Sequence, residues 1–279
     1  MEIKSHCFNL DGRKDFINLY FLGDVHEGNV NHAVDEFKEA VKIIREDPKG
    51  YWIGMGDYID AVTYTDRKRF NPVTIDPIYR VKDLTDLPGL QIENFFNKVK
   101  SIKDKCICLM IGNHEETVIK YYHNDIYKKL HHLFDNKPAK LGYVGFLNLS
   151  FIEAKQHRFS VSVGLNHGIG GGGFREGYPV NKLHDVFRSF EADLCVMGHV
   201  HHLVEDSRKL NTPDNNSKLK KVYRHWGCSG CFLKTYNQGS ANYFEANGRY
   251  EPDIGMLKAT ISMRGDRVKH IHLQKIKLG

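Results

Sequence analysis

The chain contains short apolar runs that stop abruptly at small groups of polar residues. Runs this short and this poor in charge are typical of strands that are buried on both faces of a sheet. We predict strands of this kind at residues 17–22, 51–55, 107–111, 159–165 and 194–197. Each of them is followed by a loop that holds histidine, aspartate or asparagine.

Helical periodicity fills several stretches between these runs. Residues 31–46 place their apolar side chains at helical spacing, which predicts an amphipathic helix. Together with the strands on either side, this helix predicts a strand–helix–strand unit whose two strands pair in parallel. Further helices are predicted at residues 92–99, 117–134 and 180–191. Residues 61–89 hold three prolines and predict a long excursion with little strand.

The second half of the chain has shorter runs that are separated by turn residues. Its pattern predicts further strands at residues 142–151, 203–207, 220–227, 243–250, 255–263 and 268–276. Asparagine, proline and glycine mark some of the turns between them. A parallel first half and an antiparallel-leaning second half predict two sheets packed together. No linker divides the chain, so we expect a single domain over residues 1–279.

Composition and charge narrow the class of protein without fixing a partner. With 279 residues, of which 41% are hydrophobic, the chain has ample material for a core. Its net charge of +6 is mild, and no single segment carries it. This charge tolerates an anionic substrate but does not establish a nucleic-acid partner.

The amino terminus and the apolar stretches predict an intracellular, cytoplasmic protein. The first residues lack the apolar region that a secretory signal needs. No stretch approaches the length of a membrane span, so we expect no membrane partner.

Cys228 and Cys231 form a C-x-x-C pair. Such a pair is half of a zinc site, a redox pair or simply two buried thiols. No second pair or flanking histidines complete a zinc site, which favours buried thiols.

Eight polar residues follow the five apolar runs and are candidates for one site. They are Asp24, His26, Asp57, Asn113, His114, His167, His199 and His201. The carboxyl ends of strands form the edge at which open α/β sheets bind their ligands. In D-x-H and H-x-H segments, both side chains point to the same face of an extended chain, so each pair can enter one site. Asn113 has a competing explanation, because asparagine is also a good N-cap for a following helix.

The mixture of donor atoms indicates the class of metal. Carboxylate, imidazole and amide oxygen ligands suit manganese, iron(II) or zinc better than magnesium or calcium. Thiolates are absent from the set, which argues against a structural cysteine–zinc site. The candidates are more numerous than one four-coordinate ion needs. Two divalent ions that share a carboxylate would use them, and Asp57 is the natural bridge.

The order of these residues closely resembles the calcineurin-like metallophosphoesterase superfamily across residues 17–202. The matching segments are Asp24-x-His26-x-Gly28, Gly56-Asp57-x-x-Asp60, Gly112-Asn113-His114-Glu115, His167 and Gly198-His199-x-His201. The resemblance implies an α/β fold, a four-layer α/β/β/α sandwich with two packed mixed β-sheets. Two departures are small. Glu115 stands where aspartate is also common, and the glycine run after His167 is longer than expected.

The resemblance also implies a binuclear site and a role for each candidate. The first metal would be held by Asp24, His26, Asp57 and His201, and the second by Asp57, Asn113, His167 and His199. The catalytic residues would be Asp57, as the bridge, and His114, which would act on the substrate as an acid without binding metal. We expect two manganese ions, with iron(II) or zinc as alternatives.

These expectations predict a hydrolase, a metal-dependent phosphodiesterase or phosphatase. Two cations close together hold a phosphoryl group and activate a water molecule for attack on phosphorus. His114 would donate a hydrogen bond to the phosphoryl oxygens or protonate the leaving group. The expected substrate is a phosphorylated small molecule or a nucleotide-type ester.

Three alternatives remain within the same resemblance. A nuclease would act on nucleic acid, but the stretch after His202 looks like completion of the sheets and not like a DNA-binding extension. A protein phosphatase is disfavoured because Ala61 follows Asp60 where arginine is usual. A non-catalytic scaffold that lost its metals is disfavoured because the ligands are intact in all five segments.

Two segments begin just after metal candidates and are expected at the mouth of the site. They are the excursion 61–89 and the glycine-rich segment 168–173, with Arg175 and Tyr178 just beyond. Arginine and aromatic side chains together can grip phosphate and stack a base, so we expect Arg175 and Tyr178 to contact substrate. The alternative is that both segments are surface loops with solvated charge. Their other basic and aromatic residues are Tyr64, Arg67, Lys68, Arg69, Tyr79, Arg80 and Phe174.

Overall fold

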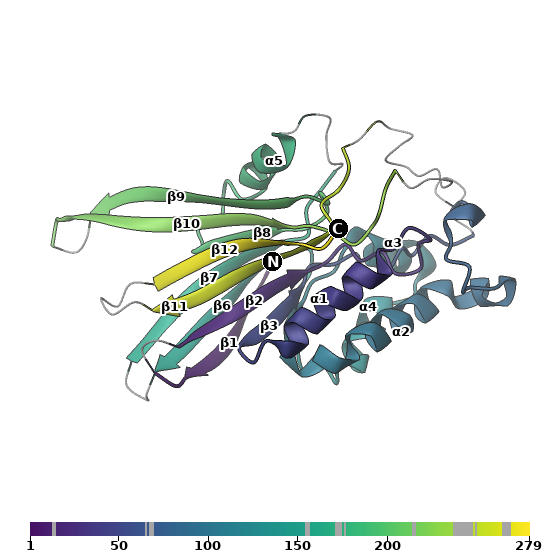
Figure 1. The fold of residues 1–279 in the computed structure, drawn as a ribbon, viewed down its shortest axis with the longest axis horizontal. Helices are drawn as coiled ribbons and strands as arrows, with labels where there is room; N and C mark the ends of the chain where they lie inside the picture. The colour runs from purple at the N-terminus through teal and green to yellow at the C-terminus, as the bar shows by residue number, and fades with distance from the viewer. Residues whose placement is uncertain are drawn as a thin grey trace.

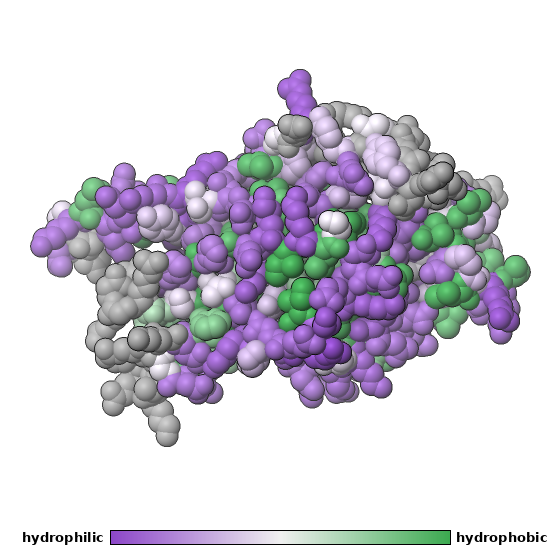
Figure 2. All heavy atoms as spheres, in the orientation of Figure 1, coloured by the Kyte–Doolittle hydropathy of each residue, from purple (hydrophilic) through white to green (hydrophobic). Residues whose placement is uncertain are grey.

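Figure 1 shows a computed structural model of the protein, in which strands and helices form separate layers. The structure describes residues 1–12, 15–64, 66, 70–153, 157–170, 175, 177–213, 216–236, 248, 250–263 and 269–279. None of the described helices is long and apolar enough to cross a membrane. Hydrophilic side chains cover most of the face in Figure 2, and hydrophobic ones are interspersed among them.

The first sheet is mixed and has six strands in the order β1-β6-β7-β8-β10-β9. Their bounds are β1 Glu2–Leu10, β6 Val144–Glu153, β7 His157–Asn166, β8 Leu194–Met197, β9 Leu203–Pro213 and β10 Leu219–Ser229. β7, β8 and β10 run parallel to one another, whereas β6 and β9 pair antiparallel with their neighbours β7 and β10.

The second sheet is also mixed and has the order β12-β11-β2-β3-β4-β5. Its bounds are β2 Phe16–Leu22, β3 Gly50–Gly54, β4 Cys106–Leu109, β5 Ala139–Lys140, β11 Gly255–Met263 and β12 Lys269–Lys277. The strands from β2 to β5 are parallel, and β11 pairs antiparallel with both β2 and β12. The predicted split between a parallel first half and an antiparallel second half is therefore confirmed for this sheet.

Helices cover the outer face of each sheet (Figure 1). On the second sheet these are α1 Val34–Glu46, α2 Leu87–Val99, α3 Asn113–Tyr122 and α4 Ile126–Leu133, and on the first sheet α5 Tyr178–Val186. Three short 3₁₀ helices complete the described elements: η1 Pro72–Thr74, η2 Val81–Asp86 and η3 Lys100–Lys105.

The alternation of side chains along each strand produces separate cores on its two faces. In β2, Leu19 and Phe21 belong to the core between the sheets, whereas Tyr20 and Leu22 belong to the core under α1 and α2. A third, smaller core joins α5 to the first sheet. The predicted four-layer α/β/β/α sandwich is therefore confirmed.

Several predicted elements need correction at their boundaries. The helix predicted at residues 31–46 begins at Val34. The single helix predicted at residues 117–134 is wrong, because α3 ends where His123 turns left-handed with a φ of 53°. Asp125 then caps α4 by accepting a hydrogen bond from the Lys128 N–H at 2.8 Å. Strand β1 was not predicted from the sequence.

Two predictions on the excursion and the carboxyl-terminal strands have different outcomes. The described residues of the predicted excursion 61–89 contain little strand, as predicted: short 3₁₀ helices and an isolated bridge at Ile75 precede helix α2, which begins at Leu87. Most of the strand predicted at residues 243–250 lies outside the described residues, as do residues 67–69 and 171–174.

Candidate metal centre

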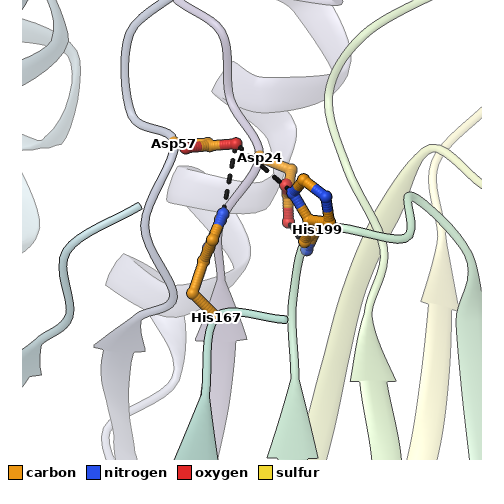
Figure 3. Close-up of side chains that lie close together, drawn as sticks. All are labelled: Asp24, Asp57, His167 and His199. Carbon is orange, nitrogen blue, oxygen red and sulfur yellow. Dashed lines mark hydrogen bonds and ion pairs between the residues drawn. The ribbon is translucent and has the colours of Figure 1, made fainter. Parts of the chain in front are cut away.

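The candidate side chains come from loops at the carboxyl ends of five strands. β2, β3 and β4 are neighbours in one sheet, and β7 and β8 are neighbours in the other. The loop that holds Asp24 joins both sheets. The Asp24 N–H donates to the Gly56 carbonyl at 2.9 Å, and the Asp24 carboxylate accepts from the His199 N–H at 2.9 Å. Figure 3 shows Asp24, Asp57, His167 and His199 gathered around a common point.

One group of ligand atoms surrounds Asp57. Potential ligand atoms of Asp24, Asp57, His167 and His199 all lie within 4.8 Å of one another. Oδ2 of Asp57 is 3.2 Å from Nε2 of His167 and 4.0 Å from Nδ1 of His199 (Figure 3). Asn113 adjoins this group, because its Oδ1 is 3.1 Å from Nε2 of His167. One cation can therefore contact carboxylate, imidazole and amide donors here.

A second group lies beside the first. Potential ligand atoms of Asp24, His26 and His201 also lie within 4.8 Å of one another. Nε2 of His201 is 3.3 Å from Oδ1 of Asp24 and 3.2 Å from Nε2 of His26. Asp24 belongs to both groups, and Asp57 comes within the same limit of His26 and His114. Both aspartates are thus placed between the groups.

Several buried ligand atoms of these groups lack a hydrogen bond. Among the described residues they include Nδ1 of His26 and Nδ1 of His199. Buried polar atoms are nearly always hydrogen-bonded, because leaving them unsatisfied is costly. Divalent cations of the manganese, iron and zinc class satisfy carboxylate oxygens and imidazole nitrogens. The residues present therefore fit such an ion.

The protonation of the cluster follows from burial and from its own charges. Burial, and then the charges of His114 and His201, hold the pKa of His26 well below its ordinary value, so this imidazole is neutral and free to bind metal. Burial opposes the charging of Asp57, yet His167 and His114 lower its pKa well below the ordinary range. In the same way Asp57 overcomes burial and raises the pKa of His167 to about 9. A cation at this site would compete with that proton.

Five candidate ligands have a left-handed backbone conformation, which is uncommon outside glycine. They are Asp24, His26, Asp57, His199 and His201, with φ between 50° and 68°. Such strain persists where the surroundings impose it, and it concentrates at functional sites. Sequence analysis did not find this feature. The available signal was the enrichment of aspartate and histidine among residues that tolerate positive φ.

His114 lies at the edge of the cluster. Its Nδ1 forms a short hydrogen bond with the backbone carbonyl of Asp60, and its Nε2 is 4.0 Å from Oδ2 of Asp57. The Asp60 carbonyl, and not a carboxylate, therefore selects the ring tautomer, with Nδ1 as the donor. The His114 side chain is 17% exposed, whereas that of Asp57 is 2% exposed. A substrate can reach the imidazole.

The helix-cap explanation for Asn113 is wrong. Helix α3 begins at Asn113 itself, and Gly112 is its N-cap residue. Gly112 is required for close approach and not for an unusual φ, since a Cβ there would lie 2.2 Å from both N and Oδ1 of Asp57. The side-chain oxygen of Asn113 is directed to His167.

Glu115 is a buried residue whose role sequence analysis missed. Its carboxylate accepts hydrogen bonds from backbone N–H groups of both the Asp57 loop and the Gly112 turn. Burial, and then the charge of Asp57, raise the pKa of Glu115 to about 7. It is absent from the metal-binding groups of the described residues.

Arg175 and Tyr178 are not joined to the cluster. Within the described part of the chain, no hydrogen bond or ion pair links either side chain to a metal candidate. The N–H of Tyr178 donates to the Arg175 carbonyl at 2.9 Å, and the Tyr178 ring lies under Lys182. Their predicted contact with substrate stays a prediction.

The two cysteines of the C-x-x-C pair are buried and free. Burial raises the pKa of the Cys228 thiol, which keeps it protonated and unreactive. Burial opposes protonation of His201, but the neighbouring Cys231 and then Asp24 raise the pKa of that imidazole well above its ordinary value. Neither thiol belongs to a metal-binding group in the described residues, which agrees with the buried-thiol interpretation.

A cleft of about 590 Å³ lies apart from these groups. It is formed by β9, β10 and β12, and its lining includes Tyr223, His225 and His272. None of its lining residues is a metal candidate. The charged residues of this cleft are largely paired, for example Lys269 with Asp193 at 2.7 Å. The cleft therefore adds no metal ligand to the cluster.

Solved structures similar to this chain are distant in sequence. Vps29 from Entamoeba histolytica is 8% identical, with a TM-score of 0.36 over 94% of this chain and 100% of that one. NAD nucleotidase from Haemophilus influenzae is 9% identical, with a TM-score of 0.43 over 94% of this chain and 50% of that one. A predicted phosphoesterase from Streptococcus pneumoniae is 10% identical, with a TM-score of 0.33 over 94% and 99%.

Comparison at the level of protein families is decisive. No curated protein matches the chain. The sequence pattern of the calcineurin-like phosphoesterases, however, matches residues 17–203, which is more than half of the chain and contains all eight candidate residues. The chain therefore belongs to the calcineurin-like phosphoesterase family.

Proposed function

We propose that the protein is a hydrolase of phosphate esters that works with two divalent metal ions. The observation that carries this proposal is the convergence of two groups of ligand atoms, from four separate loops, around Asp24 and Asp57. Their unsatisfied buried atoms are hard to explain without a cation. Membership of the family supports the same class of reaction.

Each ion would have its own set of ligands. Asp24, His26, Asp57 and His201 would hold the first, and Asp57, Asn113, His167 and His199 the second. The mixture of carboxylate, imidazole and amide oxygen favours manganese, with iron(II) or zinc as alternatives. When bound, the two cations would neutralise phosphoryl oxygens and lower the pKa of a water molecule, so that hydroxide is available to attack phosphorus near neutral pH.

His114 would supply the proton for the leaving group. The Asp60 carbonyl holds its Nδ1–H, so the ring is fixed with Nε2 on the side of the cluster, 4.0 Å from Oδ2 of Asp57. In the imidazolium form Nε2 also carries a proton, which it donates to the leaving oxygen.

We propose a nucleotide-type diester as the preferred class of substrate. The excursion after Asp60 packs beside the His26 loop, because Val30 N–H donates to the Thr74 carbonyl at 2.8 Å and Asp76 N–H donates to the Gly28 carbonyl at 2.9 Å. This segment exposes the Tyr64 ring to solvent. An exposed aromatic ring beside a phosphate site can stack a base.

A substrate panel with manganese tests this function. Protein purified without chelator should hydrolyse bis-p-nitrophenyl phosphate, p-nitrophenyl phosphate or a cyclic nucleotide, lose the activity with a chelator and regain it with manganese. A diester should be the better substrate, and its KM should rise with salt because phosphate contacts are screened. Preference for single-stranded nucleic acid would indicate a nuclease. Absence of hydrolysis by the fully metallated protein would indicate a scaffold.

A further inference from the structure

Glu115 is a fully buried carboxylate that the proposed mechanism does not use. It lies in the first turn of α3, next to His114 and two residues after Asn113. Its oxygens do not take part in the metal-binding groups found among the described residues. A buried carboxylate is costly unless hydrogen bonds satisfy it, so its partners indicate what it is for.

Four backbone N–H groups donate to this one carboxylate. Oε2 accepts from the N–H of Asp57 at 3.0 Å and from that of Gly112 at 2.9 Å. Oε1 accepts from the N–H of Tyr58 at 2.8 Å and from that of Ile59 at 3.3 Å. Three of the four donors are consecutive, and they belong to the loop after β3, whereas Gly112 belongs to the loop after β4.

The conformation of Asp57 explains how one carboxylate gathers consecutive donors. Its φ of 50° turns the chain so that the following N–H groups point into one hollow, the arrangement known as an anion-binding nest. The Glu115 carboxylate accepts these N–H groups. On the other side, Oδ1 of Asp57 accepts from the His114 N–H at 2.9 Å, which fixes the rotation of the carboxylate.

We propose that Glu115 is the positioning residue that holds Asp57 between the two metal groups, by locking the loops after β3 and β4 together. This inference rests on the proposed metal centre for its functional consequence. The lock imposes the left-handed conformation of Asp57, and with it the direction of Oδ2 toward His167. Hydrogen-bonded supports of this kind tune metal affinity, although they do not contact the ion.

The neighbouring residue offers a matched control, because Glu116 is exposed on the same turn of the helix. Glu115→Gln keeps the shape of the side chain but turns an NH₂ group toward N–H donors. Glu115→Asp keeps the charge but shortens the reach. Hydrogen exchange of residues 56–60 and 110–114, measured by mass spectrometry on the metal-free proteins, reports the lock itself. Manganese affinity reports its consequence.

We expect exchange in these two segments to quicken by about tenfold or more in both Glu115 variants, since hydrogen bonds to a charged acceptor are lost. Exchange in β7 should stay unchanged. Manganese should bind about ten- to a hundredfold more weakly, as for other supports of metal ligands. Glu116→Gln should change neither quantity, and kcat should fall in the Glu115 variants even at saturating manganese.

Three results would overturn the inference. They are unchanged exchange at residues 56–60, faster exchange spread evenly over the protein, and localised faster exchange with unchanged manganese affinity. If the variants fail to fold, the wild-type protein decides, because its Asp57, Tyr58 and Ile59 amides must exchange slowly although they lie in a loop. If wild type binds no manganese, the proposed function fails, while the exchange measurement still tests the lock.

Discussion

The two ends of strand β8 each carry a buried polar cluster, and the clusters are built differently. At the amino end, the carboxylate of Asp193 accepts from the Ser162 N–H at 3.0 Å, from Lys269 at 2.7 Å and from Arg224 at 3.3 Å. At the carboxyl end, Nδ1 of His199 is buried without a hydrogen bond, and its nearest carboxylate oxygen on Asp57 is 4.0 Å away. One end is satisfied by the protein and the other is not.

This difference separates a structural cluster from a binding site. At the Asp193 end the charged groups are paired with one another, so this cluster needs no ligand to satisfy it. The other end combines left-handed backbone conformations with buried ligand atoms that lack hydrogen bonds. A bound cation would contact those atoms and offset the cost of the strained conformations. An aspartate removed from each end should therefore have different consequences for metal binding and for activity.

The largest effect is expected for Asp57→Asn. This substitution removes the charge that the proposed centre would share between its two ions, so we expect loss of bound metal and of measurable hydrolysis. The metal-free variant should also lose stability relative to the metal-free wild type, because His167 loses the buried carboxylate that it pairs with at 3.2 Å. Metal analysis and thermal unfolding check both parts. Retained metal would place the bridge elsewhere, most directly on Asp24.

His114→Ala should separate catalysis from metal binding at the same end. We expect a loss of activity on the order of a hundredfold, as for a positioned proton donor. The metal content should match wild type, since His114 is held by the Asp60 carbonyl and not by the ligand set. Loss of metal equal to that of Asp57→Asn would move His114 into the ligand shell.

Asp193→Asn should lower stability without loss of metal. Removal of one partner from this network leaves Lys269 and Arg224 without their carboxylate, so we expect a loss of about 1–3 kcal/mol in the free energy of unfolding. Metal content and activity should be unchanged. Urea unfolding measures the stability, and a fall in metal content would show that the two ends of β8 are not independent.

The smallest effect is the pH dependence of that stability. Burial opposes ionisation of Asp193, but Lys269 and then Ser162 lower its pKa below the ordinary value of 3.8. A carboxylate with a lowered pKa stabilises the fold above the ordinary value, and this contribution is lost as the pH falls through the folded-state value. The difference in unfolding free energy between wild type and Asp193→Asn should therefore shrink below about pH 3.8. A constant difference would argue against the ion pairs.

Much of the site could be predicted from the sequence because the buried apolar strands end close to the polar residues of the site. β3 and β8 are short apolar runs that end within three residues of Asp57 and His199, so the sequence predicts their identity and their order along the chain. The same logic failed for β1. Glu2–Leu10 is mostly exposed at the edge of its sheet and is held by pairing with β6, so its polar side chains carry no apolar pattern.

Features that depend on three-dimensional approach could not be predicted. Helical spacing continues through His123, so nothing in the periodicity shows the left-handed residue that ends α3. The four donors to Glu115 come from two loops that are more than 50 residues apart, and only the folded chain brings them together. The short hydrogen bond from His114 to the Asp60 carbonyl is invisible for the same reason.

The most direct test of the account is a crystal structure of the protein with manganese, recorded with anomalous scattering. We predict two anomalous peaks, one beside His26 and His201 and the other beside His167 and His199, with the carboxylate of Asp57 between them. A single peak with Asp57 turned away, or no peak at saturating manganese, would contradict the proposed binuclear centre.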